Sequence, residues 1–369
     1  MPKIIICPDS FKGSLSASEA ADLIANACLE AIPASEVIKI PIADGGEGTV
    51  ETLGATKIAC KVNDAFFEPI ESFWGEMGDT AVIELAACAG LPQALKPNPE
   101  IASTFGVGEL ILDALDSGKR KFIIALGGSS TNDMGCGLAS ALGVRFLDTE
   151  GKEFIPAGGT LSKIAKIDMK AVDPRICECT FVTMCDVTNP LYGDKGAAFV
   201  FAPQKGADPE MVLRLDAGLR HAAAIVQRDL DLDLASVPGS GAAGGCGAGV
   251  VAFLGSKLES GINVVLDLKH FDRELSGADL VITGEGKFDF QSLDGKAISG
   301  IAARAKEAKV PMVVLAGAAA ETSSCYEMGV SAVFSIQRSA LPLEEALRIS
   351  RESLYKTALN VMKLAFCNL

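Results

Sequence analysis

The chain has 369 residues, about twice the length of a usual single domain, so two domains with a large core are expected. Apolar residues make up 49% of the sequence and charged residues 22%, which argues against long disordered stretches. The 33 lysines and arginines stand against 47 aspartates and glutamates, and the net charge of −14 would repel a phosphate backbone. Nucleic acid is therefore a poor partner, and small molecules are expected instead.

The eleven cysteines are scattered, and many lie inside apolar runs. Buried free thiols in a reducing compartment explain this pattern better than disulfides or zinc. The first apolar run, Ile4–Cys7, is too short for a signal peptide, and no run reaches the length of a spanning helix. We therefore expect a cytoplasmic protein without a membrane partner. Because the chain has only His221 and His270, its chemistry must use carboxylates, lysines and backbone amides.

Strands and helices alternate at both ends of the chain. At the N-terminal end the pattern predicts a strand at Lys3–Cys7, a helix at Ser16–Ala31 with a capping box from Ser16 and Glu19, a strand at Val37–Ile42 and a short helix from Thr49. At the far end it predicts strands at Leu280–Thr283, Met312–Ala316 and Ala332–Ile336, a loop at Gly284–Gly295, and helices at Lys296–Ala308, Thr322–Met328 and Leu343–Ala365.

Five buried strands with intervening helices predict a doubly wound parallel sheet in an α/β fold. Because neither end alone supplies enough strands, we expect residues 1–55 and 278–369 to form one Rossmann-like domain. Residues 56–277 would then be an inserted, mixed α/β domain. Within the insert we expect paired antiparallel strands over Cys60–Leu85, strands at Lys121–Leu126 and Phe181–Met184, and helices at Thr104–Leu115, from Gly137 and at Val250–Leu254.

Five short loops combine glycine with carboxylate, hydroxyl or lysine side chains, and most of them follow a strand. Ligands bind outside the carboxyl ends of strands in open parallel sheets, so five such loops favour binding over ordinary turns. Their candidate functional residues are Asp9, Lys12 and Ser14, then Asp44 and Glu47, Asn132 and Asp133, Asp186, and finally Glu285, Lys287 and Asp289. Helix capping, turn formation and structural ion pairs are the competing explanations.

The stretch Gly239–Gly244 fits the pattern G-x-G-x-x-G, which could bring the backbone amides of Gly239, Ser240 and Gly241 to a phosphate. No clear strand precedes it and no acidic ribose contact follows, which argues against a dinucleotide site. Close helix packing is the alternative reason for these glycines. The Walker A pattern does not occur, so a P-loop kinase is excluded.

A lysine beside several carboxylates is the combination that phosphoryl transfer needs. With this chemistry in view, the loops together resemble the glycerate kinase family, in its bacterial type called glycerate kinase I. The resemblance rests on Pro8–Ser16, Ala43–Thr49, Gly127–Gly135, Cys185–Leu191, Phe201–Gly206 and Pro238–Gly245. The family usually has arginine and leucine where this chain has Lys287 and Phe288. Lysine keeps the positive charge of arginine but lacks its planar guanidinium group, which can form two parallel hydrogen bonds.

The resemblance implies transfer of the γ-phosphoryl group of ATP to a hydroxyl of D-glycerate with Mg²⁺. It implies 2-phosphoglycerate more often than 3-phosphoglycerate as the product. It also implies two domains, one with a flavodoxin-like Rossmann fold and one with a distinct α/β fold. The alternative is a nonenzymatic nucleotide-binding or sensor protein, which could use the same glycine loops without needing carboxylates beside lysines. An NAD-linked oxidoreductase would need a better dinucleotide pattern.

Our hypothesis for the mechanism assigns a role to each candidate. Lys12 and Lys287 offset charge on the transferred group, while Glu285 and Asp289 hold Mg²⁺. Either Asp44 or Asp186 accepts the proton of the substrate hydroxyl. Ser14, Asn132 and Asp133 are expected to bind substrate, and the loops at Gly127–Asn132 and Gly239–Gly245 are expected to donate backbone amides to the nucleotide phosphates or to the glycerate carboxylate.

Overall fold

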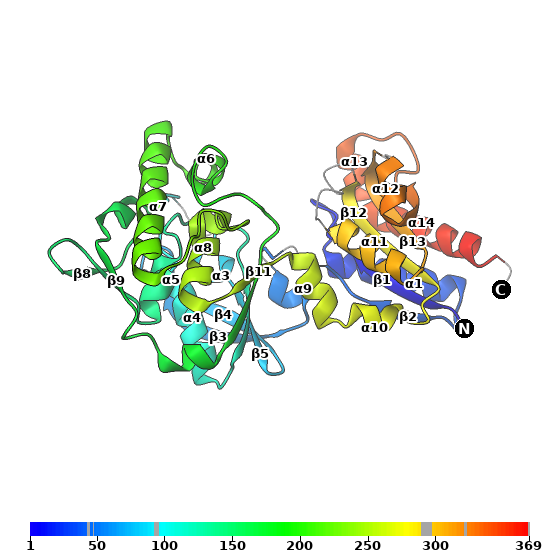
Figure 1. Ribbon diagram of the computed structural model, residues 1–369. Coiled ribbons are helices and arrows are strands. Elements are labelled where there is room, and N and C mark those ends of the chain that lie inside the picture. Colours follow the sequence, from blue (N-terminus) through cyan, green and yellow to red (C-terminus); the bar gives the residue numbers. More distant parts are fainter. Residues whose placement is uncertain (43–44, 47, 92–95, 289–296, 321–322, 368–369) are drawn as a thin grey trace. The chain divides into compact units, whose positions relative to one another are not determined.

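The computed structural model describes residues 1–42, 45–46, 48–91, 96–288, 297–320 and 323–367. The chain divides into two compact units: unit 1 contains Met1–Asp44 and Ser260–Leu369, and unit 2 contains Gly45–Glu259 (Figure 1). The boundaries expected from the sequence, after residue 55 and before residue 278, stay a prediction. Each unit has an α/β fold, as the sequence predicts.

Unit 1 contains a five-stranded parallel sheet in the order β14-β13-β12-β1-β2. Its elements are β1 (Lys3–Pro8), α1 (Ala17–Ala31), β2 (Glu36–Lys39), α9 (Gly261–Leu268), α10 (Phe271–Leu275), β12 (Leu280–Phe288), α11 (Ala297–Glu307), β13 (Met312–Ala319), α12 (Ser323–Met328), β14 (Val330–Ser335), α13 (Leu343–Arg348) and α14 (Ser350–Ala365). Counted in chain order within the unit, the strands are arranged 2-1-3-4-5, which is the flavodoxin-like order. The predicted doubly wound sheet is confirmed.

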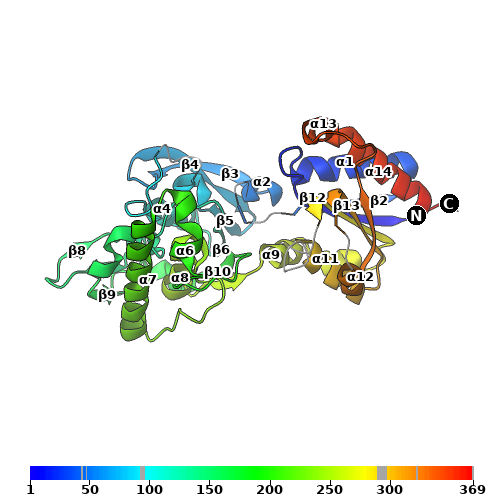
Figure 2. The same ribbon diagram turned by 90° about the horizontal axis from the view of Figure 1, so that it is seen from above.

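Helices cover both faces of this sheet because its strands are apolar on both sides. On one face, Ile4 and Ile6 of β1 pack in a buried cluster with Ile24 of α1 and Leu354 of α14. In Figure 2, α1 and α14 lie on one side of the strands, while α11 and α12 lie on the other. The predicted capping box begins α1: Ser16 accepts from the backbone N–H of Glu19, and the Glu19 side chain accepts from that of Ser16.

Two predictions for unit 1 are wrong in a way that bears on the site. The loop expected from Gly284 onward is strand β12 as far as Phe288, with Glu285 paired to Ala316 and Lys287 to Ala318. Its glycines indicate close backbone approach rather than a turn, since a Cβ on Gly284 would lie 2.4 Å from the Leu315 carbonyl oxygen. The single helix expected at Leu343–Ala365 is two helices, interrupted at Ile349 (φ −98°, ψ 6°).

Unit 2 contains a six-stranded sheet in the order β11-β10-β6-β5-β4-β3 and a small sheet in the order β8-β7-β9. Its strands are β3 (Thr56–Asn63), β4 (Pro69–Met77), β5 (Thr80–Glu84), β6 (Lys121–Ala125), β7 (Arg145–Leu147), β8 (Glu153–Phe154), β9 (Lys166–Asp168), β10 (Thr180–Met184) and β11 (Lys257–Glu259). The antiparallel pairing expected over Cys60–Leu85 is confirmed for β3 with β4 and for β4 with β5, whereas β5, β6, β10 and β11 are parallel.

The helices of unit 2 are α2 (Thr49–Thr52), α3 (Ala86–Ala89), α4 (Phe105–Asp116), α5 (Cys136–Ala141), α6 (Ala197–Phe201), α7 (Pro209–Leu230) and α8 (Ala242–Leu254), with 3-10 helices η1 (Gly158–Lys163), η2 (Pro174–Glu178) and η3 (Pro203–Lys205). Helix α8 begins earlier than the expected Val250. Inside it, Ala243, Gly244 and Gly245 are left-handed, with φ of 52°, 66° and 88°. The glycine-rich stretch is therefore part of the helix entry and not a separate loop.

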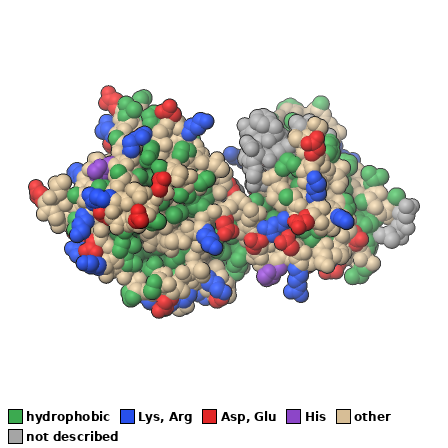
Figure 3. Space-filling view, viewed as in Figure 1, with side chains coloured by type: hydrophobic (Ala, Val, Ile, Leu, Met, Phe, Trp, Pro, Cys, Tyr) green, Lys and Arg blue, Asp and Glu red, His purple; other side chains and the backbone are tan. Residues whose placement is uncertain are grey.

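All eleven cysteines are free thiols. On the face seen in Figure 3, basic and acidic side chains are interspersed over the described surface rather than gathered by sign. Among the helices in the described ranges, none combines the length and the apolar character that crossing a membrane requires.

Candidate active site

The first candidate centre lies at the carboxyl ends of β1 and β12 in unit 1. Chain order reverses between these two neighbouring strands, and ligands of doubly wound sheets bind at this point. The two strand ends are tied together, because the backbone N–H of Asp9 donates to the Gly284 carbonyl at 2.8 Å. A Cβ on Gly286 would lie 3.1 Å from the backbone nitrogen of Lys12, so β12 runs directly against the turn that follows β1.

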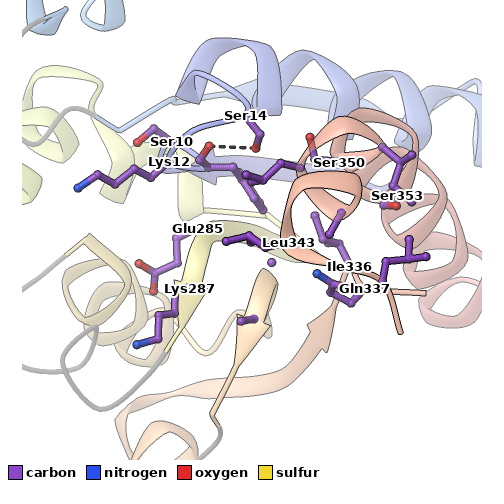
Figure 4. A pocket seen from close by; sticks show the side chains of 18 of the residues that line it. Ser10, Lys12, Ser14, Glu285, Lys287, Ile336, Gln337, Leu343, Ser350 and Ser353 are labelled. Carbon is purple, nitrogen blue, oxygen red and sulfur yellow. Dashed lines mark hydrogen bonds between the residues drawn. The ribbon is translucent and has the colours of Figure 1, made fainter. Parts of the chain in front are cut away.

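A pocket of about 470 Å³ opens at this point, and its lining combines charged, polar and apolar side chains. Glu285 and Lys287 are two residues apart on β12, so their side chains leave the same face of the strand. Figure 4 shows them beside Lys12, with all three charged groups at one end of the pocket. The lining also includes the apolar side chains of Ile336, Leu341, Leu343, Leu347 and Ile349, together with the polar or charged side chains of Gln337, Arg338, Ser350 and Ser353. The interruption between α13 and α14 thus supplies part of the apolar wall.

Two other predicted residues of this centre already serve the local turn. The Ser14 hydroxyl donates to the Phe11 carbonyl at 3.0 Å, and Asp9 Oδ1 accepts from the backbone N–H of Ser10 at 2.6 Å. Ser14 and Asp9 still line the pocket. Because the hydroxyl hydrogen of Ser14 is engaged, its oxygen is left mainly as an acceptor, which suits a bound cation or hydroxyl better than a phosphate oxygen.

Three of the acidic residues that the sequence offers as ligands cannot be placed. Asp44, Glu47 and Asp289 lie outside the described residues. Within the described ranges there is no group of three or more metal-ligating side chains. Magnesium commonly takes only one or two protein carboxylates and completes its coordination with water and substrate phosphates. Glu285 and Asp9, which both line the pocket, therefore fit such an ion.

The second candidate centre is formed by loops at the carboxyl ends of β5, β6 and β10 in unit 2. The predicted loop Gly127–Asp133 follows β6, and Asp186 follows β10 and is exposed. The backbone N–H of Ser130 donates to the Ala89 carbonyl at 2.9 Å, which ties the loop to the end of α3. The glycines of the Asp44 loop reach the same edge: Gly127 donates to the Gly45 carbonyl at 2.8 Å.

The residues at Gly239–Gly241 are explained by close packing against the loop that follows β10. A Cβ on Gly239 would lie 2.8 Å from the Cys185 sulfur, and one on Gly241 would lie 2.2 Å from the Pro190 carbonyl oxygen. The backbone N–H of Gly241 donates to the Asn189 carbonyl at 3.0 Å and is not directed at a ligand. Packing, the alternative explanation for these glycines, therefore accounts for Gly239 and Gly241. The Ser240 hydroxyl is fully buried.

The predicted pair Asn132 and Asp133 separates into two roles. The buried Asp133 carboxylate accepts from the backbone N–H and the hydroxyl of Thr104, both at 2.8 Å, and from the backbone N–H groups of Gly135 and Gly137. Burial raises the pKa of Asp133, while these hydrogen bonds act in the opposite direction. With four donors already bound, this carboxylate fits an anchoring role. Asn132 is also fully buried, and its side-chain amide faces the interior.

Sequence reasoning missed two buried charged residues, Glu84 and Lys205. Glu84, at the end of β5, accepts from the backbone N–H groups of Gly48 and Val50 and so fixes the start of α2. Lys205, at the end of η3, donates to the Ser129 hydroxyl and to the Thr131 carbonyl, both at 2.7 Å. Burial lowers the pKa of Lys205 to about 7. The only sequence signal was its place in the quoted stretch Phe201–Gly206.

Comparison with known proteins gives matches that span both units. A model of the glycerate kinase family matches residues 4–366. The chain is 46% identical to a glycerate kinase of Bacillus cereus and 42% identical to a glycerate 2-kinase of Escherichia coli, with 97% of each chain covered in both cases. A crystal structure assigned as glycerate kinase 2 from Salmonella typhimurium LT2 has 42% sequence identity and a TM-score of 0.88, with 98% of each chain covered.

Proposed function

The chain belongs to the glycerate kinase family, and from this premise we propose that it transfers the γ-phosphoryl group of ATP to D-glycerate, giving 2-phosphoglycerate and ADP. The observation that carries the proposal is the pocket of unit 1, where Lys12, Glu285 and Lys287 meet at the point of reversed strand order. Small-molecule substrates and a cytoplasmic location are part of the proposal.

The pocket lining offers both kinds of contact that ATP needs, charged groups for the phosphates and apolar side chains for the base. Lys12 and Lys287 are positioned to neutralise phosphate oxygens, and charge neutralisation accounts for much of the catalysis of phosphoryl transfer. The apolar wall that includes Ile336, Leu343 and Leu347 suits a purine base. We therefore assign the phosphates to Lys12 and Lys287 and the base to the apolar part of the lining.

Glu285 would hold Mg²⁺, with Asp9 beside it and Asp289 as the further candidate from the sequence. A bound Mg²⁺ supplies electrophilic stabilisation of the phosphate oxygens in this reaction class. Lys12 and Lys287 would orient those oxygens and stabilise the charge that develops on them.

We assign the acceptor to the loops of unit 2. In the reaction a hydroxyl oxygen of glycerate forms a bond to the γ-phosphorus, the bond from that phosphorus to the bridging oxygen of ADP breaks, and the hydroxyl proton passes to a carboxylate. Asp186, exposed at the end of β10, and Asp44 are the two candidate bases. Asn132 and Ser240 would bind the acceptor, with Asp133 anchoring the loop that carries Asn132.

The test is phosphorus NMR of the purified full-length protein with Mg-ATP and D-glycerate. We expect loss of ATP and a new resonance of 2-phosphoglycerate. A 3-phosphoglycerate resonance would keep the kinase activity and reverse the choice of hydroxyl. If folded protein binds ATP but gives neither product, the kinase proposal fails and the sensor alternative is favoured. Magnesium-free samples serve as the control.

A further inference from the structure

Three residues on two loops of unit 2 bury polar side-chain atoms without hydrogen-bond partners among the described residues. The atoms are Thr131 Oγ1, Asn132 Oδ1 and Nδ2, and Ser240 Oγ. All three residues are 0% exposed. Leaving such groups unsatisfied is costly, and native proteins almost always provide them with ordered water or ligand atoms. Three together, on two predicted binding loops, indicate a place built for a polar occupant.

The two loops that carry these atoms pack directly against each other. A Cβ on Gly244 would lie 2.0 Å from the Thr131 carbonyl oxygen and 2.6 Å from the Asn132 Cα. The left-handed run at Ala243–Gly245 makes this approach, and Ser240 begins the same helix entry, where its carbonyl accepts from the backbone N–H of Ala248 at 3.0 Å. The loop that carries Thr131 and Asn132 therefore packs against the helix entry that begins at Ser240, and we use the name polar chamber for these three residues.

Lys205 is the cation next to the polar chamber. Its side chain is 2% exposed, and its nitrogen donates to Ser129 Oγ and to the Thr131 carbonyl, both at 2.7 Å. In the described part of the chain it forms no ion pair within 4.0 Å. Two ionisable groups lie near it. One is the Asp133 carboxylate, which already accepts hydrogen bonds from four donors, and the other is the thiol of Cys246 in α8, whose pKa is raised by burial. When it is protonated, Lys205 therefore has no direct ion-pair partner among the described residues, although the Asp133 carboxylate favours its protonated form.

We propose that Lys205 is a positioning residue that holds the Ser129–Thr131 turn so that Thr131, Asn132 and Ser240 receive the carboxylate and hydroxyl groups of the acceptor. This inference rests on the proposed function and selects one of its alternatives, the acceptor acid rather than the nucleotide phosphates. The chamber offers both donors and acceptors, since an amide and two hydroxyls provide each kind. A hydroxy acid presents both kinds as well, whereas a triphosphate presents acceptors alone.

The charge of Lys205 gives this role a signature that packing alone would lack. Because burial lowers its pKa to about 7, the amine is mostly neutral near pH 8, and a neutral amine still has the two N–H groups that Ser129 and Thr131 accept. An anion placed in the chamber favours the protonated form. Binding of the acceptor near pH 8 should therefore take up close to one proton per chain, by linkage.

The first experiment is titration calorimetry of D-glycerate with the full-length protein near pH 8, in Tris and in HEPES buffers, whose ionisation heats differ. We expect proton uptake by the wild-type protein and by the exposed-lysine control Lys163→Met. In Lys205→Met we expect about tenfold weaker binding and no uptake. This inference is wrong if the wild-type protein turns over D-glycerate but takes up no proton on binding it. It is also wrong if Lys205→Met binds D-glycerate as tightly as the wild type. Neither result contradicts the proposed function. Absence of both D-glycerate binding and turnover overturns both.

A second variant covers the case in which Lys205→Met does not fold. Thr131→Val has nearly the same shape and removes a hydroxyl that has no hydrogen-bond partner among the residues the structure describes. If the hydroxyl serves a ligand, the free variant should be at least as stable as the wild type, while its affinity for D-glycerate should fall several-fold. Lower stability with unchanged affinity would assign the hydroxyl to structure and overturn the inference.

Discussion

The backbone N–H of Gly127 donates a 2.8 Å hydrogen bond to the carbonyl of Gly45. This bond joins the loop that follows β6 to the loop that begins α2, two segments about eighty residues apart in the sequence. Gly45 also approaches β10, because a Cβ there would lie 3.1 Å from the Met184 Cβ. The glycines of these loops therefore serve to bring the candidate binding segments of unit 2 together.

Replacing Gly127 with alanine should disrupt this junction. The added Cβ would lie 2.5 Å from Gly46 Cα and 2.8 Å from the Gly45 carbonyl oxygen, and both contacts are with backbone that cannot rotate away. We expect destabilisation of about 1–3 kcal/mol, measured by urea unfolding, together with at least a tenfold loss of kcat/KM for the acceptor.

Gly218→Ala in α7 is the matched control for Gly127→Ala. Its added Cβ would meet the nearest neighbour, Leu161 Cβ, at 3.3 Å, and its backbone is helical. Alanine has a higher helix propensity than glycine, so this variant should keep both its stability and its activity. Wild-type stability and kinetics in Gly127→Ala would mean that the loop junction adjusts without cost.

Substitutions of the two lysines in the unit 1 pocket should distinguish the effect of their charge from the effect of their shape. Lys12→Met and Lys287→Met are each expected to lower kcat/KM for ATP about a hundredfold, because in the proposed mechanism each removes a positive charge that stabilises the transferred group. Lys287→Arg keeps the charge and adds a planar fork, so it should retain activity and lower the KM for ATP. Steady-state kinetics check these values, with the exposed Lys363→Met of α14 as the control. Equal activity in all four variants would contradict the assignment.

Hydrophobic pattern was sufficient to predict the sheet of unit 1 from the sequence. Runs such as Ile4–Cys7 and Leu280–Thr283 are apolar on both faces, and only a sheet covered by helices on both sides buries such strands. The same reasoning failed beyond Thr283. Glycines and charged residues there are typical of a loop, whereas in the structure Gly284 and Gly286 allow Leu315 and Lys12 to approach the strand. Local pattern does not contain that tertiary contact.

The site was predictable only in part, for a related reason. Lys12, Glu285 and Lys287 could be named as candidates because each follows or extends a strand whose position could be predicted, and their roles stay a prediction. Lys205 was missed because a single lysine after Pro203 looks like an exposed turn residue. Its burial depends on packing against Ser129 and Thr131, more than seventy residues earlier in the chain. Asp133 as a ligand stays a prediction, and its four hydrogen-bond donors, which favour an anchoring role, cannot be read from the sequence.

Asp186→Asn tests the proposed base. If Asp186 accepts the proton of the acceptor hydroxyl, kcat should fall about a hundredfold or more, while the fold should be unaffected because this side chain is exposed. Asp44→Asn is the paired variant, and Glu150→Gln, in an exposed turn, is the control for loss of an acidic charge. Single-turnover assays measure the chemical step directly. Full activity in both aspartate variants would eliminate carboxylate base catalysis by either residue.

The buried Lys205 should make the stability of the protein depend on pH in a defined direction. Its pKa is lowered to about 7 in the folded chain, from an ordinary value of 10.5. Between these values the unfolded chain binds more protons than the folded chain, so the free energy of unfolding rises with pH. The slope for this one group approaches about 1.4 kcal/mol per pH unit. Below about pH 7 both states carry the proton, and the contribution is flat.

Lys205→Met removes this contribution and leaves the other titrating groups in place. The difference in free energy of unfolding between wild type and variant should therefore be constant near pH 6 and should grow in favour of the wild type from about pH 7 to about pH 9. Urea unfolding at several pH values measures it, and Lys363→Met should follow the wild-type curve. A difference that does not change over this range would mean that Lys205 keeps the ordinary pKa of a lysine despite its burial, and that an anion in the chamber gains no proton on binding.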